Sequence, residues 1–197
     1  MNARSKTVYI VKVGILSAIA GALMFLEIPL WFAPSFYKLD FSDIVALLGG
    51  FALGPVAGTI VELIKNLLHI LIKGTTTGFV GEMANFLTGC ALVLPAALFY
   101  RHKRTKKIAV IGLILGTVCL AVLGAFLNYY ILIPVYSKFL PIDAIIEMGK
   151  SINPKITDLK MLIVWAVVPF NLFKGAVDSV IVLIFYKRLA FLLKKGM

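Results

Sequence analysis

Long apolar runs separated by short polar segments dominate the amino-acid sequence. Six such runs predict membrane-spanning helices over about residues 8–26, 41–53, 56–72, 79–100, 108–133 and 161–186. A run of roughly 20 apolar residues is long enough to cross a bilayer as a helix, although the second run is shorter. Because Gly54 and Pro55 separate the second run from the third, this stretch fits either two spans or a re-entrant pair. The pattern predicts an all-α polytopic membrane protein, with one transmembrane domain (residues 1–197) that forms a compact bundle of six helices.

The composition excludes a water-soluble globule. Of the 197 residues, 61% are hydrophobic and 15% are charged, whereas soluble domains are about half apolar and about a quarter charged. The two cysteines, Cys90 and Cys119, lie inside apolar runs without the spacing of metal ligands. We find no P-loop, serine-nucleophile elbow or zinc-protease motif. The sequence therefore predicts no enzyme, no catalytic residues, no metal site and no resident cofactor.

The basic residues predict the orientation in the membrane. The net charge is +11, and clusters of Lys and Arg without acidic residues lie near the N-terminus, in residues 101–107 and near the C-terminus. Cytoplasmic loops are enriched in Lys and Arg, and the three clusters share one side only if the number of spans is even. Six spans with both termini in the cytoplasm satisfy this condition. The clusters are short and lack interleaved aromatic residues, so we expect contact with lipid head groups and not with nucleic acid.

Polar side chains inside apolar runs are costly in a membrane and therefore mark functional candidates. Asn171, Lys174 and Asp178 share one face of the last predicted span. Lys174 and Asp178 are four residues apart and could form an ion pair, which would either fix helix packing or also line a site. Glu82 and Asn85 are three residues apart at the outer end of the fourth span. These side chains point to a binding site in the outer half of the bundle.

Other candidates flank the same region. Thr76 and Thr77 precede Phe79 at the start of the fourth span, where the hydroxyl groups could contact a ligand or cap the helix. Asp40, just before the second span, could likewise be a helix cap or part of the mouth of a binding site. Asn128, near the outer end of the fifth span, faces either the bundle or the lipid head groups.

Two further stripes lie on the first and third spans. Gly14, Ala18 and Ala22 follow one another at spacing four, which permits close approach of another helix, either within the bundle or from a partner protein. The third span carries a polar stripe that fits paired packing between helices or a proton relay, and its members are Glu62, Lys65, Asn66, His69 and Lys73.

Three segments carry a resemblance to a known family: Lys38-Leu-Asp-Phe-Ser-Asp43, Gly78-Phe-Val-Gly-Glu-Met-Ala-Asn-Phe86 and Asn171-Leu-Phe-Lys-Gly175. Together with the six spans and the small residues of the first span, they resemble the substrate-binding S components of energy-coupling-factor (ECF) vitamin transporters, most closely the riboflavin-specific members. The resemblance implies a multi-pass protein of the bacterial plasma membrane that captures riboflavin from outside as a transported ligand.

The resemblance also implies partners and contacts. It implies docking through Gly14, Ala18 and Ala22 of the first span onto a shared ECF transmembrane subunit, which is joined to two ATPase subunits. It implies flavin contacts by Asn128, Asn171 and Lys174. The whole set of expected substrate-binding residues is Asp40, Thr76, Thr77, Phe79, Glu82, Asn85, Asn128, Asn171 and Lys174.

Other functions remain open at the level of sequence. One is an S component for another vitamin, such as thiamine, folate or pantothenate. A second is an ion-coupled carrier that uses Glu62 and His69, although carriers usually contain an internal repeat and we find none. A third is a membrane enzyme or scaffold, although no pair of nucleophile and base is evident.

Overall fold

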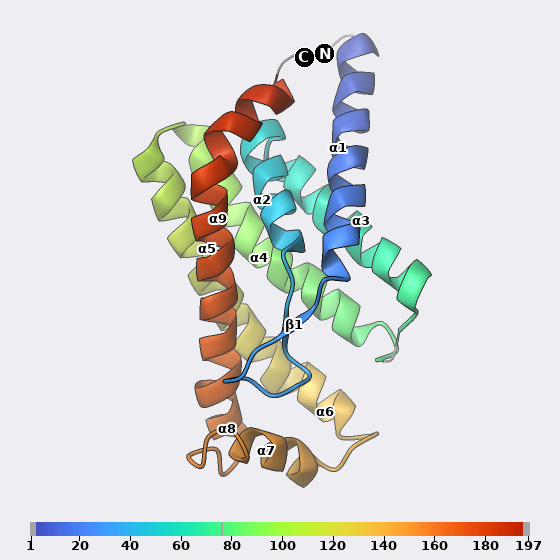
Figure 1. The fold of residues 1–197 in the computed structure, drawn as a ribbon, viewed down its shortest axis with the longest axis vertical. Helices are drawn as coiled ribbons and strands as arrows, with labels where there is room; N and C mark the ends of the chain where they lie inside the picture. Colours follow the sequence, from blue (N-terminus) through green and yellow to red (C-terminus); the bar gives the residue numbers. More distant parts are fainter. Residues whose placement is uncertain (1–2, 76, 195–197) are drawn as a thin grey trace.

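Long helices form almost the whole computed structural model, which describes residues 3–75 and 77–194. Thr76, one of the predicted site residues, lies outside the described residues. Within these residues, five helices are long and apolar enough to cross a membrane: Ala3–Met24 (α1), Pro55–Lys73 (α3), Val80–His102 (α4), Lys106–Tyr136 and Leu159–Arg188. A sixth apolar helix, Ser42–Leu53 (α2), is shorter. Figure 1 shows the helices arranged as a bundle with both ends of the chain at the same end of the molecule.

Two of these helices are composite, because each contains one π-helical turn. The first consists of α5 (Lys106–Leu127), the π-helical η1 (Asn128–Leu132) and α6 (Ile133–Tyr136). The second consists of α8 (Leu159–Leu162), the π-helical η2 (Ile163–Val167) and α9 (Val168–Lys194). Such turns within helices occur often at functional sites.

The predicted division between the second and third runs is confirmed as two separate helices. Gly54 has φ 107°, a conformation that favours glycine because it lacks a Cβ atom. Pro55 follows as the first residue of α3, where its missing N–H is not needed. The α2 helix therefore ends at Leu53, and α3 turns back beside it (Figure 1).

The structure contains two elements that the hydropathy pattern did not predict. A short antiparallel hairpin joins α1 to α2 and consists of β1 (Ile28–Pro29) and β2 (Lys38–Leu39). The segment between the fifth and sixth apolar runs, residues 134–160, contains a helix, α7 (Ile142–Lys150), at the end of the molecule away from the termini (Figure 1). It buries Ile145 and Gly149, and Gly149 packs against Leu162 and Ile156.

The α2 helix is the centre of the bundle. Every residue from Ser42 to Ala52 is buried, as expected for a helix that is apolar on all sides. Its C-terminal end packs into an aromatic cluster in which Phe51 stacks on Tyr100 at 4.5 Å between ring centroids and Tyr186 meets both rings edge-on. Because α2 is central, the polar residues at its N-terminus lie in the interior of the protein.

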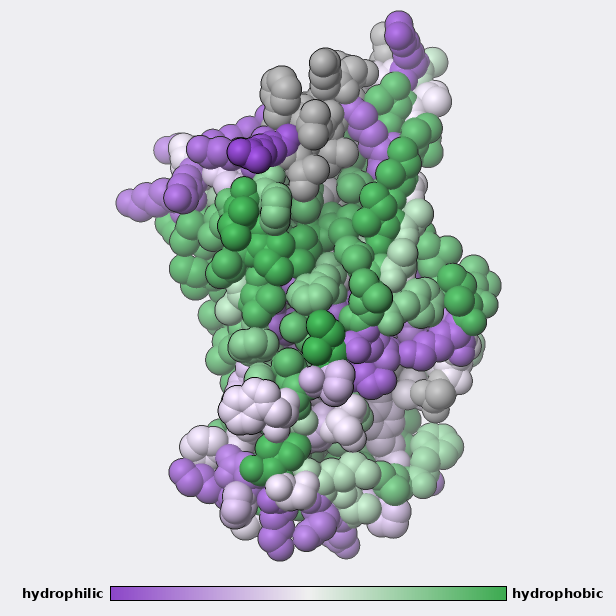
Figure 2. Space-filling view, viewed as in Figure 1, coloured by the Kyte–Doolittle hydropathy of each residue, from purple (hydrophilic) through white to green (hydrophobic). Residues whose placement is uncertain are grey.

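The outer surface of the bundle is apolar over a broad zone. Figure 2 shows hydrophobic side chains between hydrophilic residues at the end that carries the termini and a second hydrophilic zone farther along the molecule. The exposed apolar residues of the bundle include Ile15 and Ile19 of α1 and Val118 and Val122 of α5. An apolar surface of this extent fits contact with lipid.

Candidate binding site and family

A cavity of about 210 Å³ lies in the half of the bundle away from the termini. It is enclosed by the segment before α2, the first half of α4, the end of α5 with η1 and α6, and the start of α9. Aromatic rings form part of its wall, namely Phe36, Tyr37, Tyr136 and Phe170. Polar side chains form another part, namely Asp40, Asn85, Thr88, Asn128, Asn171 and Lys174. A pocket with apolar walls and a few convergent polar groups is typical of a small-molecule site.

A second cavity of about 440 Å³ adjoins the first. The two cavities share four lining residues, namely Phe36, Lys38, Asp40 and Asn85. The second cavity is the more strongly charged, because its other lining residues include Glu27, His69, Lys73 and Glu82. The two cavities together provide an aromatic compartment and a polar compartment side by side.

The structure brings most of the predicted site residues together. Five of them, from four separate parts of the chain, line the first cavity: Asp40, Asn85, Asn128, Asn171 and Lys174. Glu82 lines the second cavity together with Asp40 and Asn85. The prediction that these side chains face one site in the bundle therefore agrees with their positions, whereas their contact with a ligand stays a prediction.

Thr77 and Phe79 line neither of these cavities. The Thr77 hydroxyl accepts a hydrogen bond from the Gly81 N–H at 3.0 Å and donates one to Glu82 at 3.2 Å. Thr77 therefore satisfies a backbone N–H group at the start of α4 and orients the Glu82 side chain. The Phe79 side chain is exposed, and its backbone φ is 70°.

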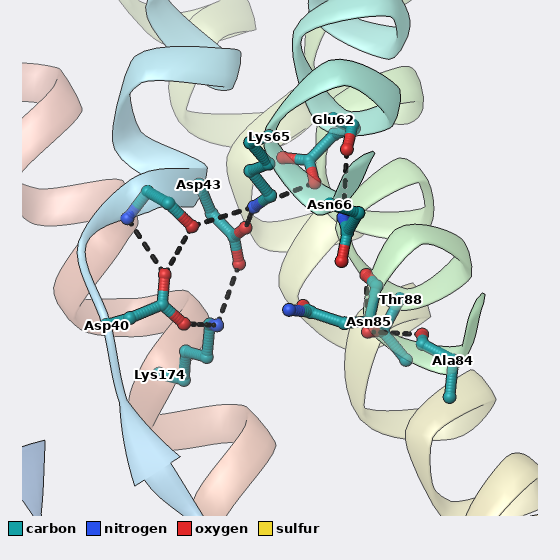
Figure 3. A network of polar contacts seen from close by, with 10 residues as sticks. Asp40, Asp43, Glu62, Lys65, Asn66, Ala84, Asn85, Thr88 and Lys174 are labelled. Atoms are coloured by element: carbon teal, nitrogen blue, oxygen red, sulfur yellow. Dashed lines mark hydrogen bonds and ion pairs between the residues drawn. The ribbon is translucent and has the colours of Figure 1, made fainter. Parts of the chain in front are cut away.

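Charged side chains form a buried network beside the first cavity (Figure 3). Lys174 Nζ lies 2.8 Å from Asp40 Oδ2 and 3.1 Å from Asp43 Oδ2. Lys65 Nζ lies against Asp43 and is 2.8 Å from Glu62 Oε2. The network therefore links the start of α2 to both α3 and α9.

The ion pair that the sequence suggested between Lys174 and Asp178 is not formed among the described residues. Lys174 instead contacts Asp40 and Asp43. Asp178 is fully buried and accepts no hydrogen bond within the described part of the chain. Helical spacing places Lys174 and Asp178 on one face, but the ammonium group pairs with two aspartates at the start of α2 and just before it.

Asp40 directly precedes Phe41, the N-cap residue of α2, and its two carboxylate oxygens have different partners. Its Oδ1 accepts hydrogen bonds from the backbone N–H of Ser42, at 2.9 Å, and from the Ser42 hydroxyl. Its Oδ2 accepts a hydrogen bond from Lys174. One oxygen therefore satisfies the start of α2, while the other holds the lysine at the wall of the cavity.

The polar stripe of α3 is paired only in part, because the buried Asn66 Oδ1 and His69 Nδ1 have no hydrogen-bond partner among the described residues. Glu62 pairs with Lys65 three residues later, and Asn66 donates a hydrogen bond to the Glu62 carbonyl. His69 stacks on Phe25 with 5.5 Å between the ring centroids. Lys73 finds its partner outside the stripe, in Glu27.

Tyr37 is a site residue that the sequence analysis missed. Its hydroxyl donates a hydrogen bond to Asn128 Oδ1, and its ring lies 5.1 Å from that of Phe170. The nearby Phe32 packs edge-on against Phe173 at 5.3 Å. Phe32 and Tyr37 lie in a segment without helical or strand periodicity, so the only signal for them in the sequence was their nearness to the Lys38–Asp43 segment.

Comparison with known proteins identifies the family. The family model described as "ECF transporter, substrate-specific component" matches residues 8–186. The chain belongs to this family. A solved structure titled "Structure and mechanism of the S component of a bacterial ECF transporter" is 36% identical, covers 96% of this chain and 99% of its own, and superposes with a TM-score of 0.74.

Curated relatives of this S component carry specific names. Riboflavin transporter RibU of Staphylococcus aureus is 39% identical over 94% of this chain and 92% of its own length. Riboflavin transporter FmnP of Bacillus subtilis is 37% identical over 90% of each chain. The S component is therefore a multi-pass membrane protein that acts in transport, and it is not an enzyme.

An ion-paired glutamate, Glu27, is part of the lining of the second cavity. Glu27, after α1, lies 2.6 Å from Lys38 of β2 and 2.6 Å from Lys73 at the end of α3. Partial burial opposes the charge of Glu27, but the hydrogen bonds and charges of the two lysines outweigh it and lower the pKa of the carboxyl group below its usual value. Glu27 therefore fastens the hairpin to α3 while it is ionised.

We expect Glu27→Gln to lower the free energy of unfolding by about 0.5–1 kcal/mol at pH 7, the usual range for partly exposed ion pairs. A lowered pKa in the folded state stabilises the protein fully above the unfolded-state pKa of about 4.3 and loses this effect as the pH falls through the lowered value. The difference between variant and parent should thus vanish in strong acid. Thermal unfolding at pH 7 and pH 3 measures this difference.

Glu147→Gln is the matched control, because Glu147 is exposed and lies 3.8 Å from Lys150. We expect no change in stability for it at either pH. Equal stability of Glu27→Gln and the parent protein at pH 7 would contradict the fastening role of Glu27.

Proposed function

We propose that this S component binds riboflavin in the two adjoining cavities and delivers it to an energy-coupling module for uptake. The observation that carries the proposal is the convergence of Asn85, Asn128, Asn171 and Lys174 on an aromatic-walled cavity. Two relatives of 39% and 37% identity are named riboflavin transporters, and each match spans about nine-tenths of both chains.

The lining has the chemistry that a flavin requires. Tyr37 and Phe170 offer aromatic surface to a flat, largely apolar ring system. The asparagine amides donate and accept hydrogen bonds, and Lys174 donates, so they can meet the carbonyl groups of the ring and the hydroxyl groups of the ribityl chain. The first cavity then takes the ring, and the adjoining polar cavity takes part of the chain.

Our proposal includes the topology of the chain. The six helices cross the membrane, with α2 as the short central one, and both termini lie in the cytoplasm. Support comes from the α4–α5 connection, which lies toward the end of the termini in Figure 1 and exposes Arg101, Lys103 and Arg104. Basic residues favour the cytoplasmic side, so the cavities open toward the outside.

It also includes docking through α1. Gly14, Ala18 and Ala22 are exposed, and a Cβ atom on Gly14 would meet nothing within 4 Å. The internal packing of α1 instead uses Ala20 and Gly21, and a Cβ atom on Gly21 would lie 2.9 Å from Leu68. The exposed small residues leave room for a helix of the ECF transmembrane subunit, whose two ATPase subunits supply the energy.

Replacing Asn171 or Lys174 by Ala should weaken riboflavin binding by about 1–3 kcal/mol, the usual cost of leaving a buried polar partner unpaired. Isothermal titration calorimetry on purified protein measures the loss. Lys160→Ala, at an exposed lysine outside both cavities, is the control and should bind like the parent protein. Unchanged affinity in both site variants would remove α9 from the binding site.

Cysteine labelling should report the topology. In a background without Cys119, which is exposed, a membrane-impermeant maleimide added to intact cells should label Ser151→Cys and not Thr105→Cys. Both positions are exposed, so both should react after the membrane is permeabilised. Labelling of position 105 from outside would overturn the proposed orientation.

The double variant Ala18→Trp, Ala22→Trp should keep riboflavin binding and thermal stability, because both side chains point away from the bundle. It should abolish riboflavin uptake and co-purification with the energy-coupling module, since two indole rings block close helix contact. Val122→Trp, on the exposed face of α5, is the control. Loss of folding or of riboflavin binding in the double variant would contradict docking through this stripe.

A further inference from the structure

We infer that Asp43, which lines neither cavity, is a positioning residue that holds the Lys174 ammonium group ready for riboflavin. This inference rests on the function proposed above, and it assigns a role in binding to a residue that does not line the cavities. Asp43 is the second residue of α2, is 1% exposed and lies 3.1 Å from Lys174 Nζ.

The Lys174 ammonium group has two carboxylates beside it within the protein, those of Asp40 and Asp43. Asp40 accepts its hydrogen bond at 2.8 Å, and Asp43 lies 3.1 Å away (Figure 3). A lysine ammonium group has three N–H donors. Two carboxylates therefore leave a third donor for an acceptor in the cavity, which Lys174 lines. In Figure 3 the Asn85 amide extends from α4 toward Asp43 and Lys174, and Asn85 lines the same cavity as Lys174.

Asp43 is itself fixed by a second helix. Its Oδ1 binds Lys65 of α3, whose Nζ also donates to the Ser42 hydroxyl at 2.8 Å. Lys65 is fully buried and has a further anion, Glu62, at 2.8 Å. Asp43 thus uses one oxygen for α3 and the other for α9, so the position of Lys174 depends on the contact between α2 and α3.

A fixed ammonium group matters because lysine has a long, flexible side chain. An ammonium group that is already held in place loses little freedom when a ligand binds, and the ligand gains affinity for that reason. Without Asp43, Lys174 would turn toward Asp40 alone. A cap at the start of α2 is not sufficient to explain Asp43, since Asp40 already accepts the Ser42 N–H.

The chain offers a matched control in Asp178. It is an aspartate of the same bundle, fully buried, and one helical turn beyond Lys174. Its carboxylate oxygens accept no hydrogen bond from the described residues. Asp178→Asn therefore makes the same chemical change as Asp43→Asn without removing a hydrogen bond or a close ion pair of Lys174 among the described residues.

The test is a double-mutant cycle on riboflavin affinity, read from the quenching of flavin fluorescence in purified full-length protein. Asp43→Asn should weaken binding at least tenfold, and Asp178→Asn should change it less than threefold. Lys174→Met should also weaken binding at least tenfold. Adding Asp43→Asn to Lys174→Met should then cost less than a further threefold. Asp43→Glu, which keeps the carboxylate, should recover most of the affinity lost with Asn.

Wild-type affinity in Asp43→Asn, or losses that multiply in the double variant, would overturn the inference. If Asp43→Asn does not fold, the same cycle is read as thermal stability: Lys174→Met should recover part of the lost stability, because it removes a cation that Asp40 alone would then neutralise, and no recovery overturns the inference. Failure of the parent protein to bind riboflavin would instead refute the proposed function, so the two failures are distinguishable.

Discussion

Two lysines are buried in an apolar bundle, and the half of the bundle that contains the cavities is arranged around their neutralisation. A charge in such surroundings is tolerated only with close counter-charges and hydrogen bonds. Asp43 supplies an anion to both Lys65 and Lys174, and Asp40 and Glu62 add one each. The start of α2 is consequently locked to α3 on one side and to α9 on the other.

The same constraint shapes the cavity. Lys174 is held at its wall and not in its centre, which leaves space beside the aromatic rings. Another part of the wall contains Asn128, which is the first residue of a π-helical turn, donates to the Gly124 carbonyl and accepts from Tyr37. Gly124 also permits close approach of Asn171, because a Cβ atom there would lie 2.7 Å from the Asn171 amide nitrogen. Two asparagines from different helices can therefore face one ligand.

The two halves of the bundle have different physical characters. The half near the termini is held by apolar packing, with close helix contacts such as Gly116 of α5 against the backbone of Leu92 in α4. The other half combines aromatic contacts with ion pairs, including the exposed bridge at Glu27. Apolar packing therefore dominates the half that carries the termini, and aromatic contacts and ion pairs dominate the half that contains the cavities.

Sequence alone determined the features that follow from local pattern. The apolar runs predicted the long helices, Gly54-Pro55 predicted the break between α2 and α3, and the cost of polar groups in a membrane singled out Asn85, Asn171 and Lys174. These inferences need only helical periodicity and transfer energies, which act within one segment of chain.

Only the tertiary structure decided which groups are partners. Spacing placed Asp178 beside Lys174, yet the lysine binds Asp40, 134 residues away in the chain. Tyr37 had no periodic signal and reached Asn128 only because the hairpin folds over the bundle. An ion pair or a hydrogen bond forms with whichever group the packed backbone brings within about 3 Å, and the packing of distant helices is not encoded in the pattern of any one of them.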